Sequence, residues 1–275
     1  AYYDIISNHV FFYEHTDRER RAPEIELLRK PQTVAHEGTH QILQNIGVQP
    51  RLAPWPLWLV EGMAEYCSPT STKKGAQWAG LGAVNPLHMA TIRDLSDPLT
   101  YKLQRLQGQE TVGTAVDPRA GVLERLLTSP DLTPTDYAWS WALVHYLAGK
   151  QPAGLVTYLK ELSTWPPLDK KTPQEQLAMF QQVFGQDLGK TERAMRKHLG
   201  ALKKYEDLPY YAVVFEEMVG GVRRRGAFVS QSPSFIRQRI EALRTPGGGP
   251  FSWRAMPFPS RSRAIVAGDQ WVQAR

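Results

Sequence analysis

The chain is short of cysteine and of long apolar runs, and each shortage narrows what it can be. It has 275 residues and one cysteine, Cys67, so no disulfide can form within it. No stretch approaches the eighteen or so apolar residues of a membrane span, and we do not expect the first residues of this sequence to be a secretory leader. Basic residues do not form a patch with interleaved aromatics, which argues against nucleic-acid binding despite a net charge of +6. We therefore expect a globular protein without a membrane span.

The most informative pattern in the chain is His-Glu-Gly-Thr-His at residues 36–40. On a helix, His36 and His40 lie one turn apart, so both imidazoles project from one face and can hold one ion. A second helical segment supplies Glu61 and Glu65, four residues apart, and burying two carboxylates without a cation would cost several kcal/mol. Because a catalytic zinc takes three protein ligands and leaves one position open, the pattern predicts a metal site rather than two unrelated helices.

The helix that carries this motif has recognisable limits. Thr33 is predicted to cap its start, and Gly47 lies where it should stop. Between them a helical stripe is predicted to be buried while the two histidines lie on the neighbouring face. The stripe consists of Ala35, Thr39, Ile42, Leu43 and Ile46.

These motifs resemble those of the gluzincin metallopeptidases. The segment Trp-Leu-Val-Glu-Gly-Met-Ala-Glu-Tyr at 58–66 is similar to the zinc-ligand helix of the M1-type aminopeptidases. The closer resemblance is to the bacterial peptidase MA-like gluzincins of the DUF1570 type, which have Tyr-Tyr-Asp before the zinc helix (here 2–4) and a Tyr-Ala-x-Ser-x-Ala-Leu-Val helix after it (here 137–144). The resemblance covers roughly residues 1–205. No G-x-M-E-N exopeptidase motif precedes the zinc helix, so aminopeptidase activity is not implied.

The resemblance implies a hydrolase, a zinc peptidase acting on a peptide or protein substrate. His36, His40 and Glu61 would hold Zn²⁺, and Glu37 would be the general base for a metal-activated water. Glu65 matches the offset of a carboxylate that orients a zinc-bound histidine through its other ring nitrogen. The alternative for Glu65 is a glutamate on the surface or in a helix-pairing contact.

Peptide hydrolysis also needs a donor for the developing oxyanion, and Tyr137 is the candidate. Thr133, Pro134 and Asp136 read as a capped helix start, which places Tyr137 near a helix N-terminus. His145, eight residues later on a similar helix face, is the other candidate for the oxyanion donor. The alternative role for Tyr137 is structural, as an aromatic side chain of the core or of the cleft rim. The other histidines have no carboxylate or cysteine partner at ligand spacing and are treated as ordinary polar residues: His9, His15, His88 and His198.

The predicted fold class is α+β: a small N-terminal sheet, the zinc helices and a mostly helical remainder. The first 14 residues read as a hairpin, one strand of which would bind the substrate backbone by resemblance to gluzincins or simply be a sheet strand. Residues 68–118 are expected to be irregular, and residues 119–205 to form helices at about 119–128, 134–149, 152–164, 173–184 and 189–204.

Three parts are expected along the chain. Residues 1–205 form the peptidase-like domain, 206–244 a small ββα appendage and 245–275 a loosely structured tail. Relatives have more sheet ahead of the zinc helix and are commonly exported, so we expect the domain to begin upstream of this sequence and the protein to act outside the cytoplasm, its leader absent here.

Two other functions remain open at this point. One is a non-catalytic, metal-containing binding module on a peptidase scaffold, and the other is a zinc hydrolase acting on a non-peptide amide bond. No cofactor other than zinc is implied. The sequence does not indicate the substrate, the choice between endo- and exopeptidase action, or the oligomeric state.

Overall fold

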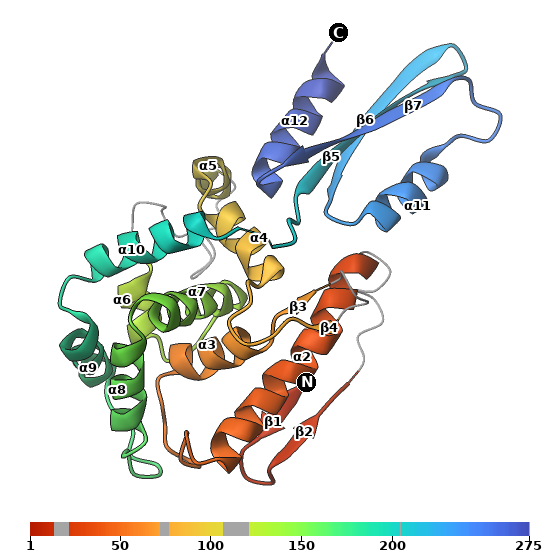
Figure 1. Cartoon of the computed structure of the whole chain (residues 1–275). Coiled ribbons are helices and arrows are strands. Elements are labelled where there is room, and N and C mark those ends of the chain that lie inside the picture. Colours follow the sequence, from red (N-terminus) through yellow and green to blue (C-terminus); the bar gives the residue numbers. More distant parts are fainter. Residues whose placement is uncertain (14–21, 72–76, 107–120, 204, 275) are drawn as a thin grey trace. The chain divides into compact units, whose positions relative to one another are not determined.

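The computed structural model describes residues 1–13, 22–71, 77–106, 121–203 and 205–274 (Figure 1). The chain divides into two compact units. The first unit consists of 1–13, 29–92 and 119–206, and the second of 14–28, 93–118 and 207–275. Helices and small antiparallel sheets occur together, in agreement with the α+β class.

The first unit contains two short hairpins and most of the helices. Strand β1 pairs antiparallel with β2, Tyr3 opposite Val10, so the predicted N-terminal hairpin is confirmed. The helices predicted between 119 and 205 are also present, with small shifts at their ends. The elements are β1 (Tyr2–Asp4), β2 (His9–Phe11), α3 (Leu57–Cys67), β3 (Thr70–Ser71), β4 (Gln77–Trp78), α6 (Leu123–Thr128), α7 (Pro134–Lys150), α8 (Pro152–Leu162), α9 (Pro173–Phe184), α10 (Leu188–Ala201) and parts of α2 (Pro23–Asn45) and α4 (Pro86–Leu95).

Helix α7 is the centre of this unit, and α3 packs directly against it. The contact is close because Gly62 of α3 faces the α7 backbone. A Cβ at Gly62 would lie 2.7 Å from the carbonyl oxygen of Ser140 and 2.8 Å from Val144 Cγ2. The glycine that follows Glu61 therefore sets how near the two helices come, and with it the position of Glu61.

An aromatic cluster attaches α3 to α8 and α9. Trp58 is 1 % exposed, and its ring stacks on Tyr158 with centroids 6.0 Å apart. Phe180 meets the same indole edge-on at 5.7 Å. Such pairs add to the free energy gained by burying the rings, so α3 is held from this side as well as by α7.

Helix α2 is longer than predicted at its start. It begins at Pro23 and continues through Pro31, so the predicted cap at Thr33 is wrong. The Thr33 hydroxyl donates instead to the carbonyl oxygen of Arg29, one turn back, which a mid-helix threonine can do without ending the helix. The predicted end is confirmed, because α2 stops at Asn45 and Gly47 has a φ of 76°.

The stripe of α2 predicted to be buried is wrong toward the end of the helix. Thr39 is buried, but Ile42 and Ile46 are exposed.

The expectation that residues 68–118 are irregular is wrong where the structure describes them. This stretch contains β3, β4, α4 and α5 (Pro98–Leu106). Helix α4 has a polar cap, since Asn85 Oδ1 accepts the N–H groups of Leu87 and His88. Asp97 accepts the N–H of Leu99 at the start of α5 in the same way. These caps are local signals that favour helices despite the many small residues around them.

The second unit is built on a three-stranded antiparallel sheet in the order β6-β5-β7. Val213 and Phe215 of β5 pack against Ile236 and Ile240 of α11. Helix α12 covers the opposite face, where a Cβ added to Gly268 would lie 3.0 Å from Ala227 Cβ. The elements are β5 (Tyr210–Val219), β6 (Val222–Ser230), α11 (Pro233–Leu243), β7 (Phe251–Phe258) and α12 (Arg261–Gln273).

Two predictions about organisation need correction. The ββα portion of 206–244 is present, but the expected loose tail from 245 contains β7 and α12, because β7 completes the sheet and Ser260 caps α12. The expected domain 1–205 is also not continuous, since 14–28 and 93–118 cluster with the C-terminal residues. Glu24, for example, accepts the N–H of Ser234 at 2.7 Å.

No described helix is both long and apolar enough to cross a bilayer.

Candidate metal centre

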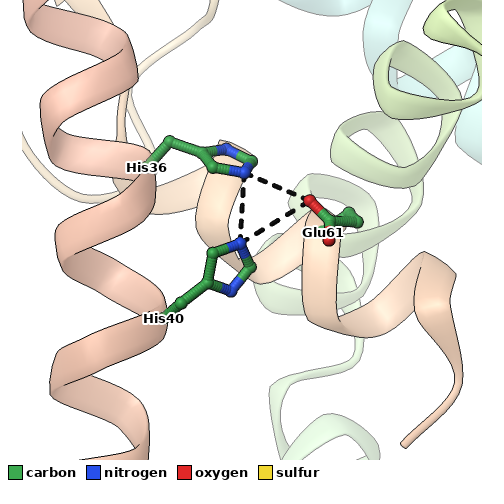
Figure 2. A group of neighbouring side chains, drawn as sticks. All are labelled: His36, His40 and Glu61. Atoms are coloured by element: carbon green, nitrogen blue, oxygen red, sulfur yellow. Dashed lines mark hydrogen bonds and ion pairs between the residues drawn. The ribbon is translucent and has the colours of Figure 1, made fainter. Parts of the chain in front are cut away.

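Three side chains from two helices meet at one point in the first unit. His36 and His40 project from α2, and Glu61 projects toward them from α3 (Figure 2). His36 Nε2 lies 3.1 Å from His40 Nε2 and 3.1 Å from Glu61 Oε2, and His40 Nε2 lies 3.6 Å from the same oxygen. The structure thus brings together the three ligands predicted from the sequence.

The spacing of these atoms suits a zinc ion. Ligands about 2.0–2.2 Å from a tetrahedral zinc lie roughly 3.3 Å from one another, close to the observed separations. Two imidazole nitrogens and a carboxylate oxygen are also a donor set that zinc accepts. The two ring nitrogens lie 3.1 Å apart, close enough for one cation to bind both. The residues present therefore fit the metal.

The charges around the triad hold it in an ionised form. Burial alone would raise the pKa of Glu61, but hydrogen bonds with His36 and His40 lower it to about 2. Burial would likewise lower the pKa of His36, but Glu61 and Glu65 raise it to about 10. The contacts with Glu61 and Glu65 thus favour the charged form of His36, and the contacts with His36 favour the charged forms of both carboxylates.

Glu65 lies where the orienting carboxylate was predicted. Its Oε1 is 3.2 Å from Nδ1 of His36, the ring nitrogen that points away from the triad. A proton on Nδ1 shared with this carboxylate leaves Nε2 free to bind a metal. Burial would raise the pKa of Glu65, but His88 and His36 hold it well below its usual value.

Three further residues hold Glu65, and the sequence analysis missed them. Glu65 Oε2 lies 2.7 Å from His88 Nε2 and accepts from Gln32 Nε2 at 2.8 Å. Asn85 Nδ2 is 3.5 Å from the same oxygen. Treating His88 as an ordinary polar residue was therefore wrong. The signal available was its place in the first turn of a helix capped by an asparagine, but nothing in the sequence pairs that helix with α3.

Glu37, the predicted general base, borders two cavities that share part of their walls. One, of about 540 Å³, extends along α2 toward its N-terminal end, past Gln32. The other, of about 390 Å³, extends toward its C-terminal end, past Gln44. His36, Glu37 and Tyr137 line both, and Glu37 is 8 % exposed. A molecule in either cavity can therefore reach this residue.

The two candidates for the oxyanion donor lie in different surroundings. Tyr137 lines both cavities, and its ring centroid is 6.3 Å from that of His36. His145 is in neither lining among the residues described, and its Nδ1 lies 2.9 Å from His198 Nε2. His198, predicted to be an ordinary polar residue without a carboxylate or cysteine partner, is thus paired with a histidine. Geometry favours Tyr137 over its rival.

The predicted capped start of α7 explains how Tyr137 is placed. Both the N–H and the hydroxyl of Thr133 donate to Asp136 Oδ2, at 2.9 and 2.7 Å, with Pro134 in the first turn. Arg125 binds the other carboxylate oxygen at 2.6 Å. Burial and the nearby carboxylates, Glu61 foremost, raise the pKa of Tyr137 to about 12, so its phenol keeps its proton at neutral pH.

The N-terminal hairpin borders the second cavity. Tyr2 and Tyr3 contribute to its lining, and the Tyr3 hydroxyl donates to Gln44 Oε1 on α2 at 3.0 Å. A strand of this hairpin as a docking edge for substrate remains a prediction. Of the remaining histidines, His9 is exposed on β2, and His15 lies outside the described residues.

One family model matches the chain, over residues 31–169, and its description is "Protein of unknown function (DUF1570)". The match includes all three residues of the triad and extends through Glu37, Glu65 and Tyr137. No curated protein and no solved structure matches the chain.

Proposed function

The chain belongs to the DUF1570 family, whose description assigns no activity, and from the chemistry of its site we propose that it is a zinc-dependent peptidase. The observation that carries the proposal is the convergence of His36, His40 and Glu61 beside a buried carboxylate, Glu37, at the junction of two cavities. Three ligands with a free carboxylate next to them form the arrangement of a hydrolytic centre rather than of a closed structural site.

The triad would hold the metal through His36 Nε2, His40 Nε2 and one oxygen of Glu61. A zinc ion there supplies a Lewis acid, which acidifies a water molecule and polarises a carbonyl group. Helix α2 fixes both histidines one turn apart, and the packing of α3 on α7 fixes the glutamate. The helices that carry the ligands are therefore positioned by packing that involves no substrate.

Glu37 would move the protons. Its carboxylate accepts a proton from the attacking water and returns it to the amine that leaves when the peptide bond breaks. Its neighbour in the chain, His36, is a proposed ligand, so the base lies beside the metal by sequence alone. Its position between the two cavities gives it access to both sides of a cleaved bond.

Tyr137 would stabilise the oxyanion that develops at the substrate carbonyl. A phenol with a pKa near 12 is a reliable O–H donor at neutral pH, and its ring reaches both cavities. Because the cavities continue in both directions along α2, a peptide has room on each side of the reacting bond. This favours cleavage within a chain over removal of a terminal residue.

The decisive experiment compares metal content with peptide cleavage. We expect purified protein to contain one zinc per chain and to cleave a quenched-fluorescence peptide library. Glu37→Gln should keep the zinc and lose at least about a hundred-fold in rate, the usual contribution of a general base. Glu124→Gln, at an exposed position on α6, is the matched control and should keep both.

Each other outcome points elsewhere. Protein without zinc, or Glu37→Gln that cleaves as fast as the parent, would contradict the proposal. Zinc-loaded protein that cleaves no peptide but hydrolyses small amide substrates would indicate a non-peptide hydrolase. Zinc-loaded protein inert toward both would indicate a binding module.

A further inference from the structure

We propose that His88 is a positioning residue for the metal centre, acting through Glu65 on His36. This inference rests on the proposed metal site and extends it to a helix outside the two motifs. His88 belongs to α4, whereas the triad and Glu65 come from α2 and α3. His88 contacts Glu65, and Glu65 in turn contacts the proposed metal ligand His36.

The two carboxylate oxygens of Glu65 have different partners. Oε1 faces His36 Nδ1 at 3.2 Å, and Oε2 faces His88 Nε2 at 2.7 Å and Gln32 Nε2 at 2.8 Å. The Glu65 side chain is only 10 % exposed, so water cannot readily replace these partners. Holding Oε2 on both sides stops the carboxylate from rotating and keeps Oε1 on the imidazole.

Helix α4 is itself fixed against the carboxylate. Asn85, fully buried, caps the helix through Oδ1 and directs its Nδ2 toward Glu65 Oε2 at 3.5 Å. The His88 ring lies 5.8 Å from the buried ring of Trp141 on α7, measured between centroids. His88 therefore has little freedom to turn away from Glu65, which is what a positioning role requires.

The consequence for metal binding is specific. An imidazole held in one orientation and one tautomer binds an ion without first being ordered, and losing such outer support commonly costs 10–100-fold in metal affinity. Gln32 provides a second hydrogen bond to the same oxygen, so the loss of His88 alone should fall within that range without abolishing the site.

The test measures zinc affinity in the full chain, by competition with a chromophoric chelator. His88→Ala should weaken zinc binding about 10–100-fold. His88→Gln, which keeps an N–H donor of similar reach, should stay within about three-fold of the parent. His9→Ala, at an exposed histidine, is the control and should not change the affinity.

A second readout separates positioning from a general loss of structure. In cobalt-substituted protein, the visible absorption of the metal should shift in His88→Ala and return in His88→Gln, with thermal unfolding checked for each variant. Unchanged affinity and spectrum in folded His88→Ala would overturn the inference, as would failure of His88→Gln to restore them. Absence of zinc binding in the parent protein would instead contradict the proposed function.

Discussion

One hydroxyl group separates two hypotheses for Tyr137, an oxyanion donor or an aromatic wall of the cavities. Tyr137→Phe removes only the phenolic oxygen, so the ring still fills its place. We expect kcat to fall about 10²–10³-fold, the usual effect of losing one donor to an oxyanion, while zinc content stays at the parent level. Steady-state kinetics on a cleaved peptide, together with metal analysis, measure both.

His145→Asn is the matched comparison, because His145 was the rival candidate and contacts His198 instead of the cavities. It should cleave at the parent rate per folded molecule. A large loss of rate in this variant combined with none in Tyr137→Phe would reverse the assignment.

Residues near the metal differ in how far the sequence could predict them. His36, His40 and Glu37 follow from spacing on a single helix, and Glu61 and Glu65 from a second short motif. His88 does not, because its partner is 23 residues away on another helix and the contact exists only after packing. The pairing of His145 with His198 could not be predicted for the same reason, because the two residues are 53 positions apart in the sequence.

At the scale of helices, the contact between α3 and α7 depends on a glycine. In Gly62→Ala, the added Cβ would meet the Ser140 carbonyl at 2.7 Å, so the helices must move apart. We expect a loss of about 1–3 kcal/mol in the free energy of unfolding, typical of overpacking. Zinc affinity should fall too, because Glu61 is the preceding residue. Chemical denaturation and chelator competition test the two effects.

Gly38→Ala provides a control within the other motif. An added Cβ there meets nothing within 4 Å, and the residue lies inside α2. Alanine should stabilise the helix by about 0.5–1 kcal/mol relative to glycine and leave metal binding unchanged. Equal behaviour of the two alanine variants would contradict the packing argument.

Elements were predictable where their ends carry strong local signals. The start of α7 follows from Thr133, Pro134 and Asp136, and the stop of α2 from Gly47. The predicted cap at Thr33 was wrong because a threonine hydroxyl can donate a hydrogen bond within a helix as well as cap one. The strand β7 was missed because its stability comes from pairing with β5 rather than from its own composition.

At the scale of the whole molecule, metal binding should affect one unit. The triad ties α2 to α3, both anchored in the first unit from residue 29 onward. Adding zinc to chelator-treated protein should slow hydrogen–deuterium exchange in 29–45 and 57–67, since a ligand that binds only the folded form stabilises it. The sheet of β5, β6 and β7 should exchange as before, and equal protection there would contradict a site confined to the first unit.

The division into units could not be predicted from the sequence. Composition changes after residue 205, and the boundary at 206 agrees with that change. The segments 14–28 and 93–118 carry no comparable mark, and they cluster with the C-terminal residues through contacts such as Glu24 with Ser234 and Arg93 with Asp207. Long-range pairs of this kind are a property of the folded chain.

The close packing of Gly62 against α7 has a consequence for when the site can form during synthesis of the chain. All three proposed ligands have been synthesised once the ribosome has added residue 61. The helix that positions α3 spans 134–150, and it also carries Tyr137. A growing chain therefore holds its metal-binding groups long before the surface that aligns them exists. The arrival of one late helix would supply both the alignment and the oxyanion donor, so peptide cleavage should begin only after most of the first unit has been synthesised.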